Sequence, residues 1–449
     1  MSTQEKQDDH STQIDISSNQ NTSGLSASTE LESEQKKNIL GDNPKPKEVI
    51  KYFSLHLLLL FVIPAAIWQK PYLCFFAIIP LSNLLTMAIE DLTAKSKAQY
   101  AAVLHAFSGN FVELVIETVA LIDKKYNIVR SAVLGAILCN ITLVRVLGIA
   151  FLAGAMPKRG NLMRASQASI HLKDSQFKAK LFVNTSASVL ALGVLALVIP
   201  TAFKIAAAPQ MNNESNSTNI NCDIQNISHA TAIILMTIYF GTLLFQLKTH
   251  VEDTLNAMEC EERRGRKPFP WYIAIFILMG SIVGITFFAM FLVRGLEEFA
   301  EHNHIGGGFI GIVILPIAVV CNFIEHYEAI KEAFNDKVDT AVSLILNTSV
   351  QMTLLVTPLL VLIGWAVDRP LSLDFNVLEL SMLACAVLIV NFLVADNMAT
   401  WLEGYMLITS YLLMAIAFFY FPEQSDTEPA HCSPFSRNLI TSNNTETGH

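Results

Sequence analysis

Long apolar runs separated by short polar stretches occupy the chain from about residue 52 to about residue 421. Each run is close to the ~20 residues that a helix needs to cross a bilayer. Eleven such runs lie at roughly 52–68, 72–90, 102–122, 129–154, 181–206, 230–247, 271–293, 308–330, 340–365, 376–395 and 404–421. The pattern predicts an all-α polytopic membrane protein with about eleven transmembrane helices.

Composition agrees with this prediction. Hydrophobic residues make up 52% of the 449-residue chain and charged residues 15%, against roughly 25% charged residues in soluble domains. The seven cysteines form no Cys-x-x-Cys pair, which argues against a zinc site or a redox motif. The sequence also holds no His-Glu-x-x-His motif. We therefore expect a protein that is not an enzyme.

The polar stretches divide the chain into five parts. Residues 1–49 are rich in Ser, Gln, Asn, Glu and Lys and predict a disordered cytosolic tail. Residues 50–247 and 271–421 form two transmembrane halves. Residues 248–270 form an acidic cytosolic linker or short helix, which is either a solvated connection or a binding segment for divalent cations. Residues 422–449 form a second disordered tail.

Basic residues and glycosylation sequons predict the orientation. The segment 155–180 is rich in Lys and Arg and is expected in the cytosol. The predicted loop 207–229 holds sequons at Asn213, Asn216 and Asn226, which fits a lumenal face and a glycoprotein. The tail, with a sequon at Asn443, falls on the same side, where Cys222 and Cys432 would be able to form a disulfide. The short loop 123–130 disagrees, because it is basic and yet predicted to be lumenal.

One polar stretch occurs twice inside apolar runs. Residues 109–113 read Gly-Asn-Phe-Val-Glu, and residues 321–326 read Cys-Asn-Phe-Ile-Glu-His, 212 residues later. The same offset carries Lys125 onto Lys337. Matching segments in two halves are a signature of secondary transporters. We expect one leading helix followed by two inverted five-helix repeats.

The duplicated residues suit a cation that alternates with protons. Asn110, Glu113 and Glu117 share one helical face. The second copy offers a similar stripe of Asn322, Glu325, Glu328 and Glu332, with His326 beside it. Hard cations such as Ca²⁺ prefer carboxylate and amide oxygens, and paired carboxylates in a low dielectric also bind protons. Glu113 and Glu325 are the predicted metal and proton ligands, whereas Glu117, Glu328 and His326 are auxiliary or relay candidates. The alternative is a structural pairing of one acid with Arg145.

Over about residues 50–421, the chain resembles the cation/proton exchanger family, the vacuolar Ca²⁺/H⁺ antiporters of the Ca²⁺:cation antiporter superfamily. The resemblance consists of short segments that follow one another in the family's order. The matching segments are Ile79–Leu81, Ala88–Leu92, Gly109–Ile116, Phe245–His250, Phe309–Gly311, Leu315–Ile317, Glu325–His326, Asp336–Asp339, Ser349–Gln351, Val356–Leu359 and Gly364–Trp365. The chain departs from the family pattern at Phe111, Val112, Cys321, Ala136 and around Arg145.

The resemblance implies a proton-coupled antiporter, most simply for Ca²⁺, in the vacuolar membrane, with another endomembrane such as the endoplasmic reticulum as the alternative. It places Asn110, Asn322, Thr348 and Gln351 among the polar residues around the glutamates. It implies no cofactor, and as partners only lipid, the transported cations and protons, with no nucleic acid. The oligomeric state stays open. Two alternatives remain: an exchanger for Na⁺, K⁺ or Mn²⁺, and a regulatory or scaffold homologue impaired in transport.

Overall fold

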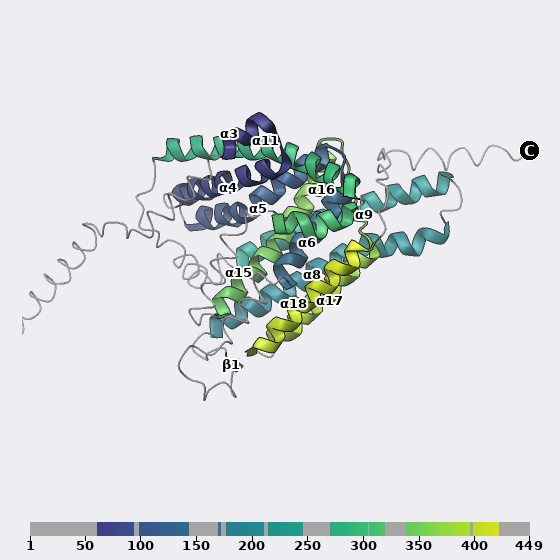
Figure 1. Cartoon of the computed structure of the whole chain (residues 1–449). Helices are drawn as coiled ribbons and strands as arrows, with labels where there is room; N and C mark the ends of the chain where they lie inside the picture. Colours follow the sequence, from purple (N-terminus) through teal and green to yellow (C-terminus); the bar gives the residue numbers. More distant parts are fainter. Residues whose placement is uncertain are drawn as a thin grey trace, which may run out of the picture. The chain divides into compact units, whose positions relative to one another are not determined.

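The computed structural model describes residues 61–93, 98–142, 169–171, 177–210, 214–245, 270–303, 305–318, 338–395 and 398–421. These residues form helices and one short strand pair (Figure 1). The elements are α3 (Val62–Trp68), α4 (Pro71–Thr93), α5 (Ala98–Ile122), α6 (Tyr126–Thr142), β1 (Ser169–His171), α8 (Phe177–Ala207), η4 (Ala208–Gln210), α9 (Glu214–Leu244), α11 (Trp271–Asn303), α12 (Gly307–Phe309), η6 (Ile310–Ile314), α13 (Leu315–Ala318), α15 (Val338–Gln351), η8 (Met352–Val356), α16 (Thr357–Ala366), α17 (Val377–Ala395), β2 (Met398–Thr400) and α18 (Trp401–Phe419).

Within the described residues, five helical segments are long and apolar enough to cross a membrane: Pro71–Thr93, Val183–Ala207, Asn219–Leu244, Trp271–Ala300 and Val342–Ala366. Three shorter apolar helices accompany them, at Tyr126–Ile141, Val377–Phe392 and Gly404–Phe419. Large apolar side chains face outward on these helices, for example Phe276 (79% exposed) and Phe392 (75% exposed). Such surfaces suit contact with lipid, and the predicted helical membrane fold is confirmed.

The two halves of the chain pack against each other through several helix pairs. Helices α6 and α15 pack against each other, and α6 also packs on the π-helical segment η6 from the second half. Helix α4 of the first half packs along α11 of the second. The two halves are therefore interleaved rather than set apart as separate domains.

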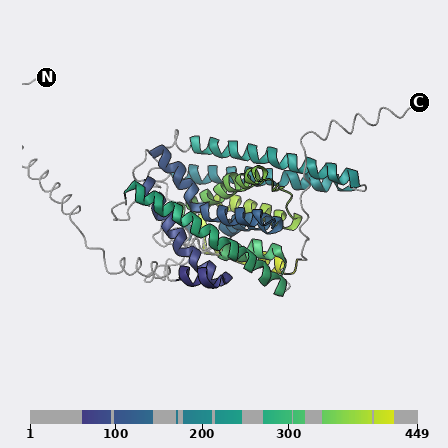
Figure 2. The same cartoon turned by 90° about the horizontal axis from the view of Figure 1, so that it is seen from above.

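The connection between α8 and α9 corrects one prediction. The stretch 207–229 was expected to be a lumenal loop, but α9 already begins at Glu214 and runs 31 residues beside α8 (Figure 2). Between residues 214 and 240 the sequence contains no proline or glycine, and Ser228 is fully buried. The side chain of Asn226 is exposed on this helix, whereas Asn213 lies outside the described residues. Cys222 is disulfide-bonded, with a partner outside them.

Ion pairs join turns that the sequence placed on the same membrane face. Asp123 accepts from Arg294 Nε at 3.0 Å, and Lys125 pairs with Glu297, so the turn after α5 is tied to the end of α11. Helix α11 therefore extends about ten residues past its predicted end near residue 293. Strands β1 and β2 pair two segments predicted for the opposite face. These contacts agree with the predicted alternation of the helices, and the pairing of Lys125 neutralises part of the basic loop 123–130.

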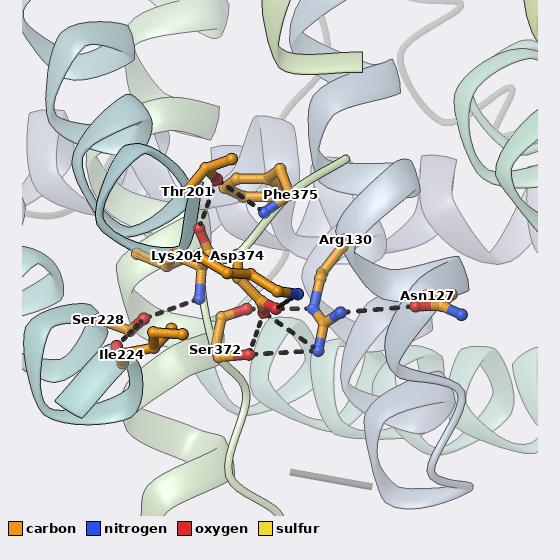
Figure 3. A network of polar contacts seen from close by, with 10 residues as sticks. Asn127, Arg130, Thr201, Lys204, Ile224, Ser228, Ser372, Asp374 and Phe375 are labelled. Carbon is orange, nitrogen blue, oxygen red and sulfur yellow. Dashed lines mark hydrogen bonds and ion pairs between the residues drawn. The ribbon is translucent and has the colours of Figure 1, made fainter. Parts of the chain in front are cut away.

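A polar network holds the connection between α16 and α17 (Figure 3). Asp374 pairs with Lys204 of α8 (Nζ–Oδ2 2.7 Å) and with Arg130 of α6 (Nη2–Oδ1 3.5 Å). The hydroxyl of Ser228 accepts the Leu373 N–H at 2.9 Å. Side chains from three helices, α6, α8 and α9, thus satisfy polar groups of this connection, as a neighbouring strand would do in a sheet.

Removing the charge of Asp374 is expected to loosen this network. Burial alone would raise the pKa of Asp374, but the charges of Arg130 and Lys204 and the hydrogen bonds from Lys204 and Ser372 hold that pKa below its usual value. A lowered pKa stabilises the fold above the unfolded pKa of about 3.9, and this stabilisation is lost as pH falls through the folded pKa. We therefore expect Asp374→Asn to cost on the order of 2 kcal/mol at pH 7 and equally at pH 5.

Thermal melting in detergent at both pH values measures the cost. Lys204→Met should cost less, because the Lys204 side chain is 47% exposed whereas that of Asp374 is 12% exposed. An Asp374→Asn protein that melts with the wild type would contradict the role given to this network.

Candidate cation site

Helix α5 carries three buried polar side chains on one face. Asn110, Glu113 and Glu117 are 2%, 5% and 3% exposed. Their spacing of three and four residues brings them to the same side of the helix. The two carboxylates are four residues apart on α5 and are therefore neighbours on its surface. The prediction that these residues share a buried face is confirmed, since all three point away from the lipid-facing surface.

A hydrogen bond joins this face to the second half of the chain. Asn110 Nδ2 donates to Gln351 Oε1 at 2.8 Å, and both residues are buried. Gln351 is the last residue of α15, immediately before the π-helical segment η8. Two residues predicted for the site, 241 positions apart in sequence, therefore meet.

Both π-helical segments precede a proline. Pro316 follows η6 and Pro358 follows η8, and proline cannot donate the usual backbone bond to the residue four positions earlier. The helices widen instead, so that Leu315 N–H reaches Ile310 O and Thr357 N–H reaches Met352 O, five residues back. Such irregular turns recur at functional sites. Here they lie next to the polar face of α5, since η8 follows Gln351 and η6 leads to the cavity described next.

A cavity of about 10 Å³ lies against the two glutamates. Its walls come from α5, α6 and α13, and the lining residues are Glu113, Ile116, Glu117, Ala132, Ala136, Leu315 and Pro316. This volume is roughly that of one water molecule. A cation held there would have to shed most of its water and take protein oxygens in exchange, which suits a hard cation with carboxylate ligands.

Oxygen atoms suited to such a cation are present. Among the described residues, Asn110 Oδ1 and Glu117 Oε2 are buried without a hydrogen-bond partner. A buried acceptor without a donor carries a desolvation cost, which a bound cation or water would relieve. The described residues contain no group of three or more His, Cys, Asp or Glu side chains arranged for a metal ion.

Several predicted residues lie outside the described part of the chain: Asn322, Glu325, His326, Glu328, Glu332 and Arg145. Of the remaining predicted residues, Thr348 donates its hydroxyl to the Leu344 carbonyl of its own helix at 3.1 Å. Among the described residues, the cavity wall does not include Thr348. The meeting of Glu113 with Glu325 stays a prediction.

Sequence reasoning missed one buried acid, Glu379 of α17, which is 6% exposed. Glu379 lies three residues into a run that was predicted to span the membrane. An acid at membrane depth is a functional candidate, and the same feature had indicated Glu113. Glu379 went unnoticed because no repeat partner marks it.

The fold and site together define a class. Interleaved repeats, broken helices and a buried polar site at their meeting point are the architecture of a secondary transporter. The sequence matches the family described as "Sodium/calcium exchanger protein" over residues 71–248 and 273–420, and the chain belongs to this family.

The chain is similar to individual relatives along most of their length. The chain is 32% identical to a "Vacuolar calcium ion transporter" of Schizosaccharomyces pombe, an alignment that covers 77% of this chain and 78% of the relative. It is 30% identical to a "Ca(2+)/H(+) antiporter" of Synechocystis, covering 77% and 89%. It is 29% identical to "Vacuolar cation/proton exchanger 3" of Arabidopsis thaliana, covering 91% and 89%.

Solved structures show the same fold. The chain superposes on native YfkE with a TM-score of 0.61 and 24% identity, covering 82% of this chain and 100% of that one. It superposes on an H⁺/Ca²⁺ exchanger CAX with a TM-score of 0.56 and 14% identity, covering 82% and 92%. At these identities the likeness concerns the fold alone.

Proposed function

We propose that the protein is an antiporter that exchanges a cation, in the first place Ca²⁺, for protons across the vacuolar membrane. The observation that carries the proposal is the buried face of Asn110, Glu113 and Glu117, which borders a cavity and is bonded across the repeat interface to Gln351. Relatives named as vacuolar calcium transporters and Ca²⁺/H⁺ antiporters support the choice of ion and membrane.

Competition between protons and the cation for the same oxygens drives the exchange. A divalent cation binds deprotonated carboxylates and expels their protons, and protons arriving from the acidic side expel the cation. Glu113 and Asn110 supply ligands from the first half. The internal duplication assigns Glu325 and Asn322 to the equivalent positions in the second. Two carboxylates would balance the charge of one Ca²⁺ or hold two protons, so the site would be electrically neutral in both states when its access changes from one face to the other.

Alternating access follows from the way the halves are interleaved. The cavity has walls on α5 and α6 of the first half and on α13 of the second half. Rocking of one half against the other would open the cavity to each face in turn. A homologue that had lost transport would be expected to close this space with a fixed ion pair, and the cavity beside Glu113 and Glu117 favours the exchanger.

Cation uptake into sealed vesicles tests the proposal. Purified protein is reconstituted, the interior is made acidic, and uptake of radiolabelled Ca²⁺ is measured alone and against Mn²⁺, Na⁺ and K⁺. We expect Ca²⁺ uptake that depends on the pH gradient and disappears when a protonophore collapses it. Uptake that ignores the gradient would refute proton coupling, and preference for another cation in the competition would reassign the substrate.

A further inference from the structure

A second buried carboxyl group lies outside the cavity. Glu379 occupies the first turn of α17 and is 6% exposed. Its Oε1 accepts a hydrogen bond from Ser131 Oγ of α6 at 2.8 Å. Helix α12 passes directly over the pair, because a Cβ placed on Gly308 would lie 3.1 Å from Glu379 Oε1 and 3.8 Å from Ser131 Oγ. The carboxyl group is thus enclosed by three helices, two of them from the second half of the chain.

Among the residues that the structure describes, no basic side chain forms an ion pair with this carboxyl group, although the charge of Arg130 acts on it through space. The charged groups on the elements around it are Arg130 beside Ser131 on α6, Lys204 on α8 and Asp374 on the connection before α17. Arg130 directs its donors to Ser372, Asn127 and Asp374, and Lys204 pairs with Asp374 (Figure 3). The hydrogen bonds and ion pairs of both basic groups therefore go to residues other than Glu379, and only the charge of Arg130 reaches Glu379, without direct contact. A buried acid with a hydrogen bond but no directly paired cation is costly for a purely structural role and is a functional candidate by default.

The pair adjoins the central cavity through one helix interface. Ser131 precedes Ala132, which lines the cavity, and Ala136 lines it one turn further on. About 7.5 Å of helix axis separates Ser131 from Ala136. On the facing segment, a Cβ on Gly311 would lie 2.5 Å from Ser131 Cβ and 2.9 Å from Ala132 N, and the same segment continues to Leu315 and Pro316 in the cavity wall. On its other side, Glu379 follows the connection held by Asp374.

We propose that Glu379 and Ser131 form a proton-transfer station between the central site and the end of the bundle closed by the connection 367–376. This inference rests on the proposed proton-coupled exchange. In the step assigned to it, a proton held by Glu379 passes to a carboxylate at the central site, directly or through intervening water, and Glu379 is left as the carboxylate. Only O–H bonds break and form. The Ser131 hydroxyl, which both donates and accepts, stabilises the carboxylate form by the hydrogen bond seen here.

Two transport modes measured on the same vesicles test the station. Ca²⁺/H⁺ exchange needs a net movement of protons, whereas exchange of radiolabelled Ca²⁺ for unlabelled Ca²⁺ needs none. We expect Glu379→Gln to slow Ca²⁺/H⁺ exchange about tenfold or more and to leave Ca²⁺/Ca²⁺ exchange within about twofold of the wild type. Ser131→Ala should slow only the proton-coupled mode, by about threefold. The ratio of the two modes is independent of how much protein is folded.

Ser281→Ala is the matched control, because it also removes a buried hydroxyl, on α11. It should leave the ratio unchanged. If both variants slowed the two transport modes equally, or if neither variant slowed any mode, the proposed role of Glu379 and Ser131 in proton transfer would be refuted. The proposed exchange function would still stand. If Glu379→Gln yields no folded protein, Ser131→Ala alone decides by the same ratio. Absence of any proton-driven uptake in the wild type would refute the proposed function itself, and the station with it.

Discussion

Glu113→Gln is expected to abolish proton-driven Ca²⁺ uptake. Glutamine keeps the size of the side chain but removes the charge that both the cation and the proton require. In a buried site, the loss of one carboxylate ligand to a divalent cation costs on the order of 3 kcal/mol, so uptake should fall by a factor of about 100 or more. The measurement is initial uptake into acid-loaded vesicles, with protein content determined in the same vesicles.

The matched control for this variant is Glu298→Gln on α11. It makes the same chemical change at an exposed position, where we expect uptake to equal the wild type. Glu113 has a second, independent readout, because binding of Ca²⁺ in detergent should weaken together with uptake. A Glu113→Gln protein that binds and transports Ca²⁺ like the wild type would show that the cation site does not lie on α5.

Much of this site was predictable because the physical cause is local. The spacing of Asn110, Glu113 and Glu117 places them on one helical face wherever that helix packs, and their cost in lipid requires that the face be buried. The sequence also indicated Gln351 as a polar residue of the second half, although not its bond to Asn110.

What escaped prediction depends on partners distant in sequence. The first turns of α9 resemble a polar loop until Ser228 is seen to accept the N–H of Leu373, 145 residues away. The last turns of α11 carry the charges that bind Asp123 and Lys125. Hydropathy marks only where a helix is apolar, so it began α9 too late and ended α11 too early. In each case a contact between the two halves of the chain supplies the missing stabilisation.

The widened helices show a different limit. Pro316 and Pro358 predict an interruption, and membrane helices tolerate one when other groups satisfy the backbone. Whether such a helix kinks, breaks or takes an extra residue per turn depends on its neighbours. Thr357 illustrates this, because its hydroxyl donates to the Met352 carbonyl at 2.7 Å within the widened turn. The outcome matters for function, since the widened turns border the cavity and the bond to Asn110.

Gly135→Ala is expected to disrupt both the fold and transport. A Cβ on Gly135 would lie 2.5 Å from Ile312 Cα and 2.7 Å from the Gly311 carbonyl oxygen. These are backbone atoms, which cannot rotate away as a side chain can, so α6 and η6 would have to separate. Close approach of backbones through small residues is how membrane helices pack without a hydrophobic driving force. We expect a loss of about 3 kcal/mol or more, at or beyond the upper range for overpacking.

The same displacement would reach the cavity, because α6 contributes Ala132 and Ala136 to one wall and the segment after η6 contributes Leu315 and Pro316 to the other. Folded Gly135→Ala protein should therefore also exchange Ca²⁺ at least about tenfold more slowly than wild type. Thermal melting and vesicle uptake measure the two effects. Gly241→Ala is the control, since a Cβ on Gly241 meets nothing within 4 Å, and it should match the wild type in both. If Gly135→Ala did the same, the two helices would not touch as described, and the cavity between them would lose its rigid frame.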